Sequence, residues 1–221
     1  MALTDNYNSN VFINCPFDSE YKPLLNAIVF TIIYLGYNPR LSLEESDSGK
    51  FRLQKILNII KESRFGIHDL SRIQASKKNE FFRFNMPFEL GADFGCKEYS
   101  SDYSDKLFLV LSSKRFDYMK AISDLNGVDI KNHNDSAQEV LNKVREWFIE
   151  TVGLRDIDAP LKMWYRYSDF QTSLFKSKFA KLYGEYDENS AEKIAKDQIK
   201  NMTLPEYIDE LRQYLNGYDC H

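Results

Sequence analysis

The sequence predicts an α/β fold in which helices cover both faces of a parallel β-sheet, followed by a helical C-terminal extension. Between residues 11 and 111, short apolar runs alternate with amphipathic segments of helical period, a pattern typical of parallel sheets. Beyond residue 160 the composition changes, and aromatic residues recur at helical spacing. We therefore expect an α/β domain over residues 1–154 and a helical extension over residues 155–221.

Length and composition agree with one large domain that carries an appendage. The chain has 221 residues, 43% of them hydrophobic, and a formal net charge of −4. Lysine and arginine form no long basic run, so we expect no direct binding of nucleic acid. No apolar stretch approaches the roughly 18–20 residues of a membrane helix, and no signal-peptide pattern opens the chain, so we expect a cytoplasmic protein without a membrane partner. The three cysteines are far apart and indicate neither a disulfide framework nor a metal site.

The first predicted elements are two strands with a helix between them. Residues 11–15 form an apolar run ended by Pro16 and predict a buried strand. A helix is expected from about residue 19 to residue 35, ended by Gly36. Residues 37–43 predict the second strand. The inner face of the helix consists of apolar residues at helical spacing, namely Leu24, Leu25, Ile28, Ile32 and Leu35.

The same alternation continues to the fourth predicted strand. An acidic, turn-rich loop over residues 44–49 precedes a predicted helix over residues 50–63 and a third strand over residues 64–70. A polar, basic loop is expected over residues 71–82. The fourth strand, residues 106–111, is the most apolar.

The later segments are predominantly helical. We expect a helix over residues 115–124, a short strand or loop over residues 127–133, and a strongly amphipathic helix over residues 137–151. In the extension, residues 161–185 predict helical segments and residues 205–215 predict a final helix. An aromatic stripe is expected to face the core or a partner in the first of these segments: Tyr165, Tyr167, Phe170, Phe175, Phe179 and Tyr183.

Polar residues follow three of the predicted strands. Asn14 and Asp18 follow the first strand, Glu44 follows the second, and His68 and Asp69 end the third. In open α/β sheets the ligand site lies beyond the carboxyl ends of the strands, so we expect these side chains to gather there. The alternative is structural, because such residues also cap turns and helices or remain in solvated loops.

Glu89 is a lone carboxylate in an otherwise apolar stretch, residues 83–95. We expect Pro87 in the first turn of a helix, where its missing N–H costs nothing, and Glu89 in the same turn. Gly91 and Gly95 share a helix face and are expected to allow close approach of a backbone or a ligand. A carboxylate in apolar surroundings is costly unless it has a function; a favourable charge at the helix N-terminus is the alternative.

The order of these motifs resembles a known superfamily, the Toll–interleukin receptor (TIR)-like and nucleoside 2-deoxyribosyltransferase-like proteins. The resemblance covers roughly residues 11–112 and implies a flavodoxin-like, TIR-like fold. The Gly of the transferases' Gly-Pro-Phe turn is replaced by cysteine, and their lead-in to the nucleophilic Glu is absent, so the pattern is closer to bacterial TIR-like proteins. The motifs are Asn14-Cys15-Pro16-Phe17-Asp18, Ser63-Arg64, His68-Asp69-Leu70-Ser71 and Phe88-Glu89-Leu90-Gly91.

The resemblance implies cleavage of an N-glycosidic bond, with Glu89 and Asp69 as catalytic residues. Glu89 would act as the nucleophile or would stabilise an oxocarbenium-like state. NAD is the leading substrate, rather than a cofactor, because its nicotinamide is already a cationic pyridinium, which leaves as a neutral molecule and needs no general acid. A homo-oligomer, a role in antiphage defence or signalling, and no bound metal are also expected. The residues expected to contact the substrate are Asn14, Pro16, Phe17, Asp18, Glu44, His68, Asn85 and Met86.

Two alternatives stay open. A nucleoside N-glycosidase or 2-deoxyribosyltransferase has a poorer leaving group and needs a proton donor, which Asp69 or His68 could supply. A non-catalytic module that senses nucleotides or acts as a scaffold would make Glu89 structural.

Overall fold

The computed structural model describes residues 6–44, 47–72, 84–114, 122–125 and 127–218. The chain divides into two compact units, Met1–Ile157 and Asp158–His221, where the sequence predicted a division between residues 154 and 155. Within the described ranges, every helix is too short or too polar to span a bilayer.

The first unit is built on an all-parallel sheet, which confirms the predicted α/β class. The strand order is β2-β1-β3-β4-β5, the order of flavodoxin-like sheets, which place their ligand site where the order reverses, between β1 and β3. Strand β1 pairs with both β2 and β3, so its carboxyl end lies at this reversal. The strands are β1 (Asn10–Asn14), β2 (Asn38–Arg40), β3 (Phe65–Asp69), β4 (Leu107–Ser112) and β5 (Lys131–Asn132).

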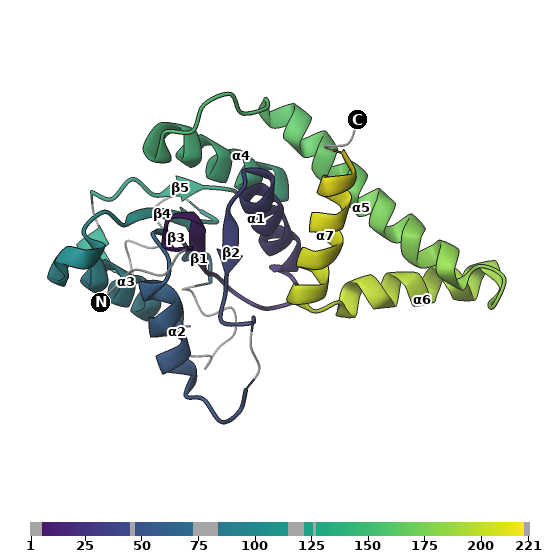
Figure 1. Cartoon of the computed structure of the whole chain (residues 1–221), viewed down its shortest axis with the longest axis horizontal. Coiled ribbons are helices and arrows are strands. Elements are labelled where there is room, and N and C mark those ends of the chain that lie inside the picture. Colours follow the sequence, from purple (N-terminus) through teal and green to yellow (C-terminus); the bar gives the residue numbers. More distant parts are fainter. Residues whose placement is uncertain (1–5, 45–46, 73–83, 115–121, 126, 219–221) are drawn as a thin grey trace. The chain divides into compact units, whose positions relative to one another are not determined.

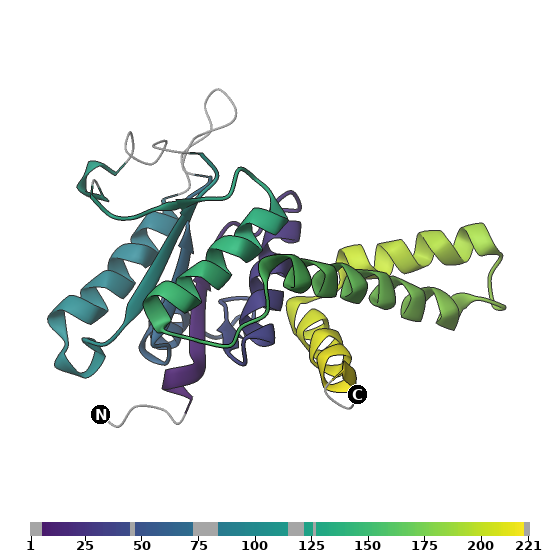
Figure 2. The ribbon, with the colours of Figure 1, turned by 90° about the horizontal axis from the view of Figure 1, so that it is seen from above.

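Helices cover both faces of the sheet, as predicted (Figure 1). Helices α1 (Lys22–Tyr34) and α4 (Ala137–Trp147) pack against each other on one face. Helices α2 (Arg52–Lys61) and α3 (Asn85–Tyr99) pack against each other on the opposite face. Figure 2 shows α3 and α4 on the two sides of the sheet. The sheet is therefore buried on both faces, which explains why β1 and β3 are buried along their whole length.

Local sequence explains where these elements begin and end. Gly36 has a φ of +82° directly after α1, the left-handed conformation that favours glycine at a helix end. Strand β2 is shorter than predicted and has Pro39 at its centre. This strand lies at the sheet edge, where the missing N–H of proline is tolerated.

The shorter elements only partly match the sequence prediction. Most of the predicted helix over residues 115–124 and of the predicted loop over residues 71–82 lies outside the described residues. The predicted amphipathic helix ends earlier, at Trp147, and continues as a π-helical turn, η5 (Phe148–Val152), before Gly153 at a φ of +89°. The short 3-10 turns are η1 (Tyr7–Ser9), η2 (Ser101–Tyr103) and η4 (Ser123–Leu125).

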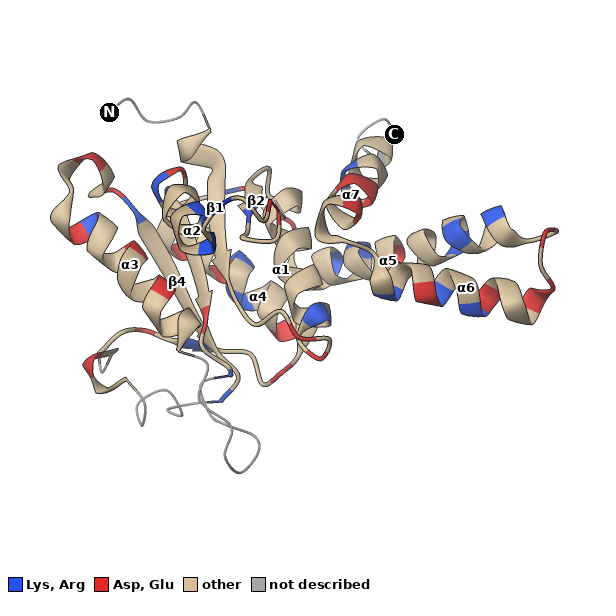
Figure 3. Cartoon of the chain, turned by 90° about the horizontal axis from the view of Figure 1, so that it is seen from below, with Lys and Arg blue, Asp and Glu red and all other residues tan. Residues whose placement is uncertain are grey.

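The second unit is helical, and α5 (Pro160–Leu182), α6 (Glu188–Asn201) and α7 (Leu204–Tyr218) are its elements. Helix α6 was not predicted. It carries lysines and acidic residues along its length (Figure 3). Its buried side chains are two alanines, Ala191 and Ala195. The sequence therefore shows little of the apolar periodicity by which a helix is predicted.

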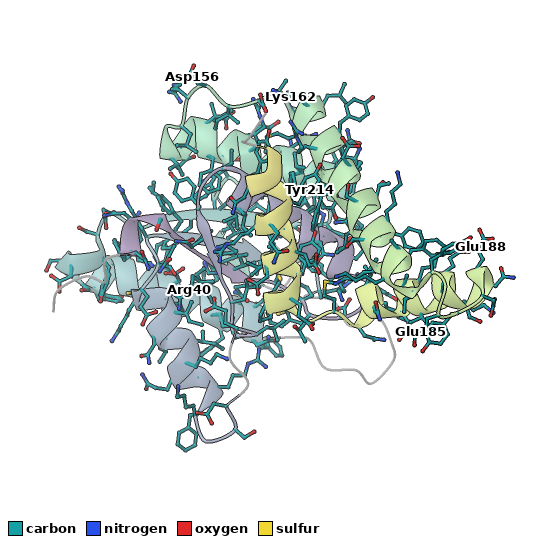
Figure 4. All side chains as sticks on the ribbon, turned by 45° about the vertical axis from the view of Figure 1, so that its right-hand side comes forward. Arg40, Asp156, Lys162, Glu185, Glu188 and Tyr214 are labelled. Carbon is teal, nitrogen blue, oxygen red and sulfur yellow. The ribbon has the colours of Figure 1, made fainter. Side chains whose placement is uncertain are left out.

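Aromatic contacts hold α7 against α5. The ring centroid of Phe170 lies 5.5 Å from that of Tyr207 and 5.3 Å from that of Tyr214, and Figure 4 shows Tyr214 on α7 near α5. The predicted aromatic stripe is only partly buried, because Tyr165 and Tyr183 are 62% and 67% exposed. Figure 4 also shows Glu185 and Glu188 at the turn between α5 and α6.

Candidate functional site

A cavity of about 320 Å³ lies at the carboxyl end of β1, where the strand order reverses. Such cavities are the usual location of ligands in this class of sheet. Five of the predicted substrate-binding residues line it. The lining consists of Cys15, Pro16, Phe17, Asp18, Arg52, Asn85 and Met86.

Asn14 joins the end of β1 to the start of α3. Its Nδ2 donates to the main-chain oxygen of Met86 at 2.8 Å and approaches His68 Nδ1 at 3.1 Å. Asn14 is 1% exposed and does not line the cavity itself. Its hydrogen bond instead holds Met86 in position at the cavity wall. On the other wall, Asp18 Oδ1 accepts the N–H of Tyr21 at 2.9 Å in the turn before α1.

Glu89 is the predicted catalytic residue, and it is 6% exposed. Helix α3 begins at Asn85, two residues before Pro87, so Glu89 is the fifth helical residue and not part of the first turn as predicted. The helix dipole stabilises charge mainly within the first turn, so this position weakens the purely structural reading. Its neighbours Met86 and Leu90 pack into a core cluster with Leu70, and they hold this part of α3 against the sheet.

No donor in the described part of the chain hydrogen-bonds the Glu89 carboxylate. Burial raises the pKa of Glu89 to about 7, and the positive charge of Arg52 opposes part of that rise. The pKa of the buried Cys15 thiol is raised chiefly by burial, next by the charge of Asp69 and then by the charge of Glu89. Glu89 is therefore electrostatically coupled to two residues of the cavity wall.

Asp69, the second predicted catalytic residue, is fully buried and saturated with donors. Its Oδ2 accepts from the Tyr21 hydroxyl and lies 3.0 Å from His133 Nε2. Its Oδ1 accepts from the Ser71 N–H at 2.8 Å and from the Ser71 hydroxyl. Burial alone would raise the pKa of Asp69, but the bonds from His133, Ser71 and Tyr21 outweigh it and lower the pKa below its usual value.

His68 lies in a buried polar network and not on the cavity wall. Its Nδ1 lies 3.1 Å from Asn14 Nδ2, and its Nε2 lies 3.1 Å from Asp93 Oδ2. Asp93 Oδ1 in turn lies 3.1 Å from Lys106 Nζ. The Lys106 ammonium also donates to two main-chain oxygens, that of Ile60 in α2 and that of Ser63 just after this helix.

Two further expectations differ from the structure. Glu44 does not lie at the cavity: its carboxylate pairs with Arg40 Nε at 3.0 Å, beside a separate groove. Arg40 also pairs with Glu62 at 3.1 Å. Glu44 therefore belongs to a cluster of charged residues around Arg40 and not to the cavity. In the described structure a Cβ at Gly91 would meet nothing within 4 Å, and one at Gly95 only the Tyr99 ring at 3.8 Å, so no other described backbone makes the close approach predicted for this helix face.

Three residues at or near the site were missed by the sequence prediction: Arg52, Tyr21 and His133. Arg52 opens a helix as one cation among several, and no local pattern marks it. His133 follows β5, a strand of two residues that carries too little periodicity to locate a strand end. Among the described residues, no group of His, Cys, Asp and Glu side chains is arranged to hold a metal ion.

Comparison of the chain with protein-family models, curated protein sequences and solved structures finds no significant match.

Proposed function

We propose that this protein cleaves the N-glycosidic bond of a nucleotide, with NAD as the leading substrate and Glu89 as the nucleophile or oxocarbenium stabiliser. The observation that carries the proposal is the Glu89 carboxylate. It is 6% exposed, has no hydrogen-bond donor among the described residues, and is coupled to the wall of a polar cavity at the sheet's reversal point.

The proposed chemistry needs one carboxylate near the anomeric carbon of the ribose. Breaking the bond to the base places positive charge on the sugar, and a carboxylate stabilises this charge or forms a covalent glycosyl ester. When it is ionised, a buried carboxylate without a donor offers both oxygens to the positive charge on the ribose, because no protein hydrogen bond competes for them. Its TIR-like motif, Phe88-Glu89-Leu90-Gly91, supports the same assignment.

The environments of Asp69 and His68 favour NAD over a nucleoside. A nucleoside base needs protonation as it leaves. Both oxygens of Asp69 already accept hydrogen bonds, and its lowered pKa keeps it ionised. Both ring nitrogens of His68 are used inside the core. Neither residue is placed to donate a proton to a base, and nicotinamide is the leaving group that needs none.

The test is nicotinamide release from NAD by purified protein, followed by chromatography. Glu89→Gln keeps the shape of the side chain and removes its charge, so we expect the rate to fall by about 100-fold or more without a lower melting temperature. Glu98→Gln is the matched control, because it makes the same change at an exposed position of the same helix. Retained activity in Glu89→Gln would contradict the catalytic role.

Other outcomes would favour the alternatives. Release of free base from nucleosides, but not of nicotinamide from NAD, would favour a nucleoside N-glycosidase or deoxyribosyltransferase. Nucleotide-induced thermal stabilisation without turnover of any substrate would favour a nucleotide-sensing module.

We also propose that the protein acts in the cytoplasm as a homo-oligomer. Helix α3, which carries Glu89, exposes two large aromatic side chains: Phe88 is 58% and Phe94 is 53% exposed. Exposed aromatic residues are enriched at protein interfaces, so this helix offers a surface for a second copy beside the proposed catalytic residue.

A further inference from the structure

Arg52 is a cation on the cavity wall without a carboxylate partner in the described structure. Its side chain is exposed and lines the same cavity as Asp18 and Asn85. Two other arginines are paired: Arg40 with Glu44 and Arg64 with Asp105, both at 3.0 Å. The charge of Arg52 is therefore free to meet a ligand anion.

The start of α2 adds to this positive potential. Arg52 is the first residue of the helix, Phe51 caps it without a side-chain hydrogen bond, and the first turn contains no acidic residue. The first N–H groups of a helix lack intrahelical partners, and they attract anions together with the helix dipole.

Glu89 supplies an independent observation close to this cavity, because it is electrostatically coupled to two residues of the cavity wall, Arg52 and Cys15. It is more than nine-tenths buried and lacks a hydrogen-bond donor in the described structure. Arg52 lies close enough to influence its ionisation, yet the two do not form an ion pair within 4.0 Å. A cation on the cavity wall and a buried carboxylate close to that wall are thus not paired with each other.

We propose that Arg52 binds a phosphate group of the substrate, so that the site selects phosphorylated ribosides over unphosphorylated ones. The inference rests on the proposed cleavage of a nucleotide and adds the residue that determines this specificity. Guanidinium binds phosphate through two parallel hydrogen bonds, while Glu89 faces the sugar.

Nicotinamide mononucleotide and nicotinamide riboside provide a matched pair of substrates. They share the scissile bond and the leaving group and differ by one phosphate. A hydrogen bond to a charged group contributes about 1.5–3 kcal/mol, so we expect kcat/KM to favour the mononucleotide by roughly 10–100-fold. In Arg52→Gln this preference should fall toward one, chiefly through KM for the mononucleotide.

The ratio of the two substrates separates two effects of Arg52. Removing its charge also raises the pKa of Glu89 further, but that change affects both substrates equally and cancels in the ratio. Lys55→Gln is the control, because Lys55 lies on the same helix and lines the separate groove near Arg40. It should keep the wild-type ratio. A preference that survives in Arg52→Gln, or is absent from the wild type, overturns the proposal.

Failure of the proposed reaction would be visible separately. If neither substrate releases nicotinamide, the phosphate site is tested by calorimetric titration with AMP and with adenosine. AMP should bind the wild type more tightly than adenosine does, and Arg52→Gln should remove the difference. Equal binding of AMP and adenosine by the wild type would overturn the phosphate site itself.

Discussion

At the scale of single residues, Glu89 is a group whose charge lowers the stability of the fold. Its pKa is raised from 4.5 to about 7 by burial, so the folded protein prefers the neutral acid. The folded protein therefore binds a proton more tightly than the unfolded chain between these values, and this contribution to stability is lost as pH rises through about 7. Residues that weaken the fold in this way are frequent at functional sites.

The raised pKa predicts the pH dependence of the proposed reaction. Only the ionised carboxylate stabilises the oxocarbenium-like state, so kcat/KM for NAD should rise tenfold per pH unit and level off above about 7. Steady-state rates between pH 5 and 9 measure this profile, and Glu98→Gln should leave it unchanged. A rate that is already level from about pH 5.5 upward, as expected for the ordinary glutamate pKa of about 4.3, would contradict the raised pKa of the buried carboxylate.

The same shift predicts how stability responds to Glu89→Gln. At pH 5 the variant and the wild type should unfold at similar urea concentrations, because glutamine resembles the neutral acid. At pH 8.5 the variant should be the more stable protein by up to about 3 kcal/mol, since only the wild type must ionise a buried group. A variant that is less stable at pH 8.5 would show that the carboxylate has a stabilising partner.

At the scale of elements, a buried polar network ties β3, β4 and α3 together. His68 belongs to β3, Asp93 to α3, and Lys106 immediately precedes β4. All three side chains are fully buried, so their hydrogen bonds and charges must be satisfied by each other and by the main chain. The network fixes the position of α3 against the sheet, and Asn14 extends it to the first turn of that helix.

Gly66 makes room for this network. A Cβ at this position would lie 2.6 Å from Asp93 Oδ2, 2.8 Å from His68 Nε2 and 3.0 Å from the Phe108 ring. We expect Gly66→Ala to destabilise the protein by roughly 1–3 kcal/mol, because packed polar groups must move apart. Urea unfolding measures the change.

The control for this substitution is Gly91→Ala on α3. No described atom lies within 4 Å of a Cβ there, and alanine favours helix over glycine by about 0.5–1 kcal/mol. Gly91→Ala should therefore be neutral or stabilising. Equal effects of the two substitutions would contradict the packing argument.

At the scale of the whole molecule, the first unit by itself supplies every residue that lines the cavity. Helix α3 of this unit exposes two aromatic side chains, Phe88 and Phe94. We propose that the protein assembles through this exposed face of α3. If assembly completes the site, nicotinamide release per protein molecule should increase with protein concentration, in step with the mass measured by light scattering.

Phe94→Ser tests the assembly surface without touching the cavity. It should shift the association to higher protein concentration and reduce activity by the same proportion, because it removes exposed apolar area from α3. Activity that is fully retained in a strictly monomeric wild-type protein would reject the assembly proposal.

The sequence by itself determined the class of fold and the most unusual carboxylate. Apolar runs of strand length and segments of helical period report local structure and burial, so they predicted four strands and most of the described helices of the first unit. Gly36 and Pro16 marked boundaries for reasons of backbone geometry. Glu89 stood out because a single charge in an apolar stretch is visible without a structure.

Only the tertiary structure decided which polar groups meet. It paired Asp69 with a histidine that follows the edge strand β5 and joined Glu44 to Arg40 away from the cavity. It also placed Arg52 on the cavity wall, close enough to Glu89 to influence its ionisation. Periodicity tells which side of an element is buried, but a polar partner is set by the packing of elements distant in the chain. For this reason the sequence predicted the edge of the sheet where the candidate cavity lies, and the structure showed which residues line that cavity.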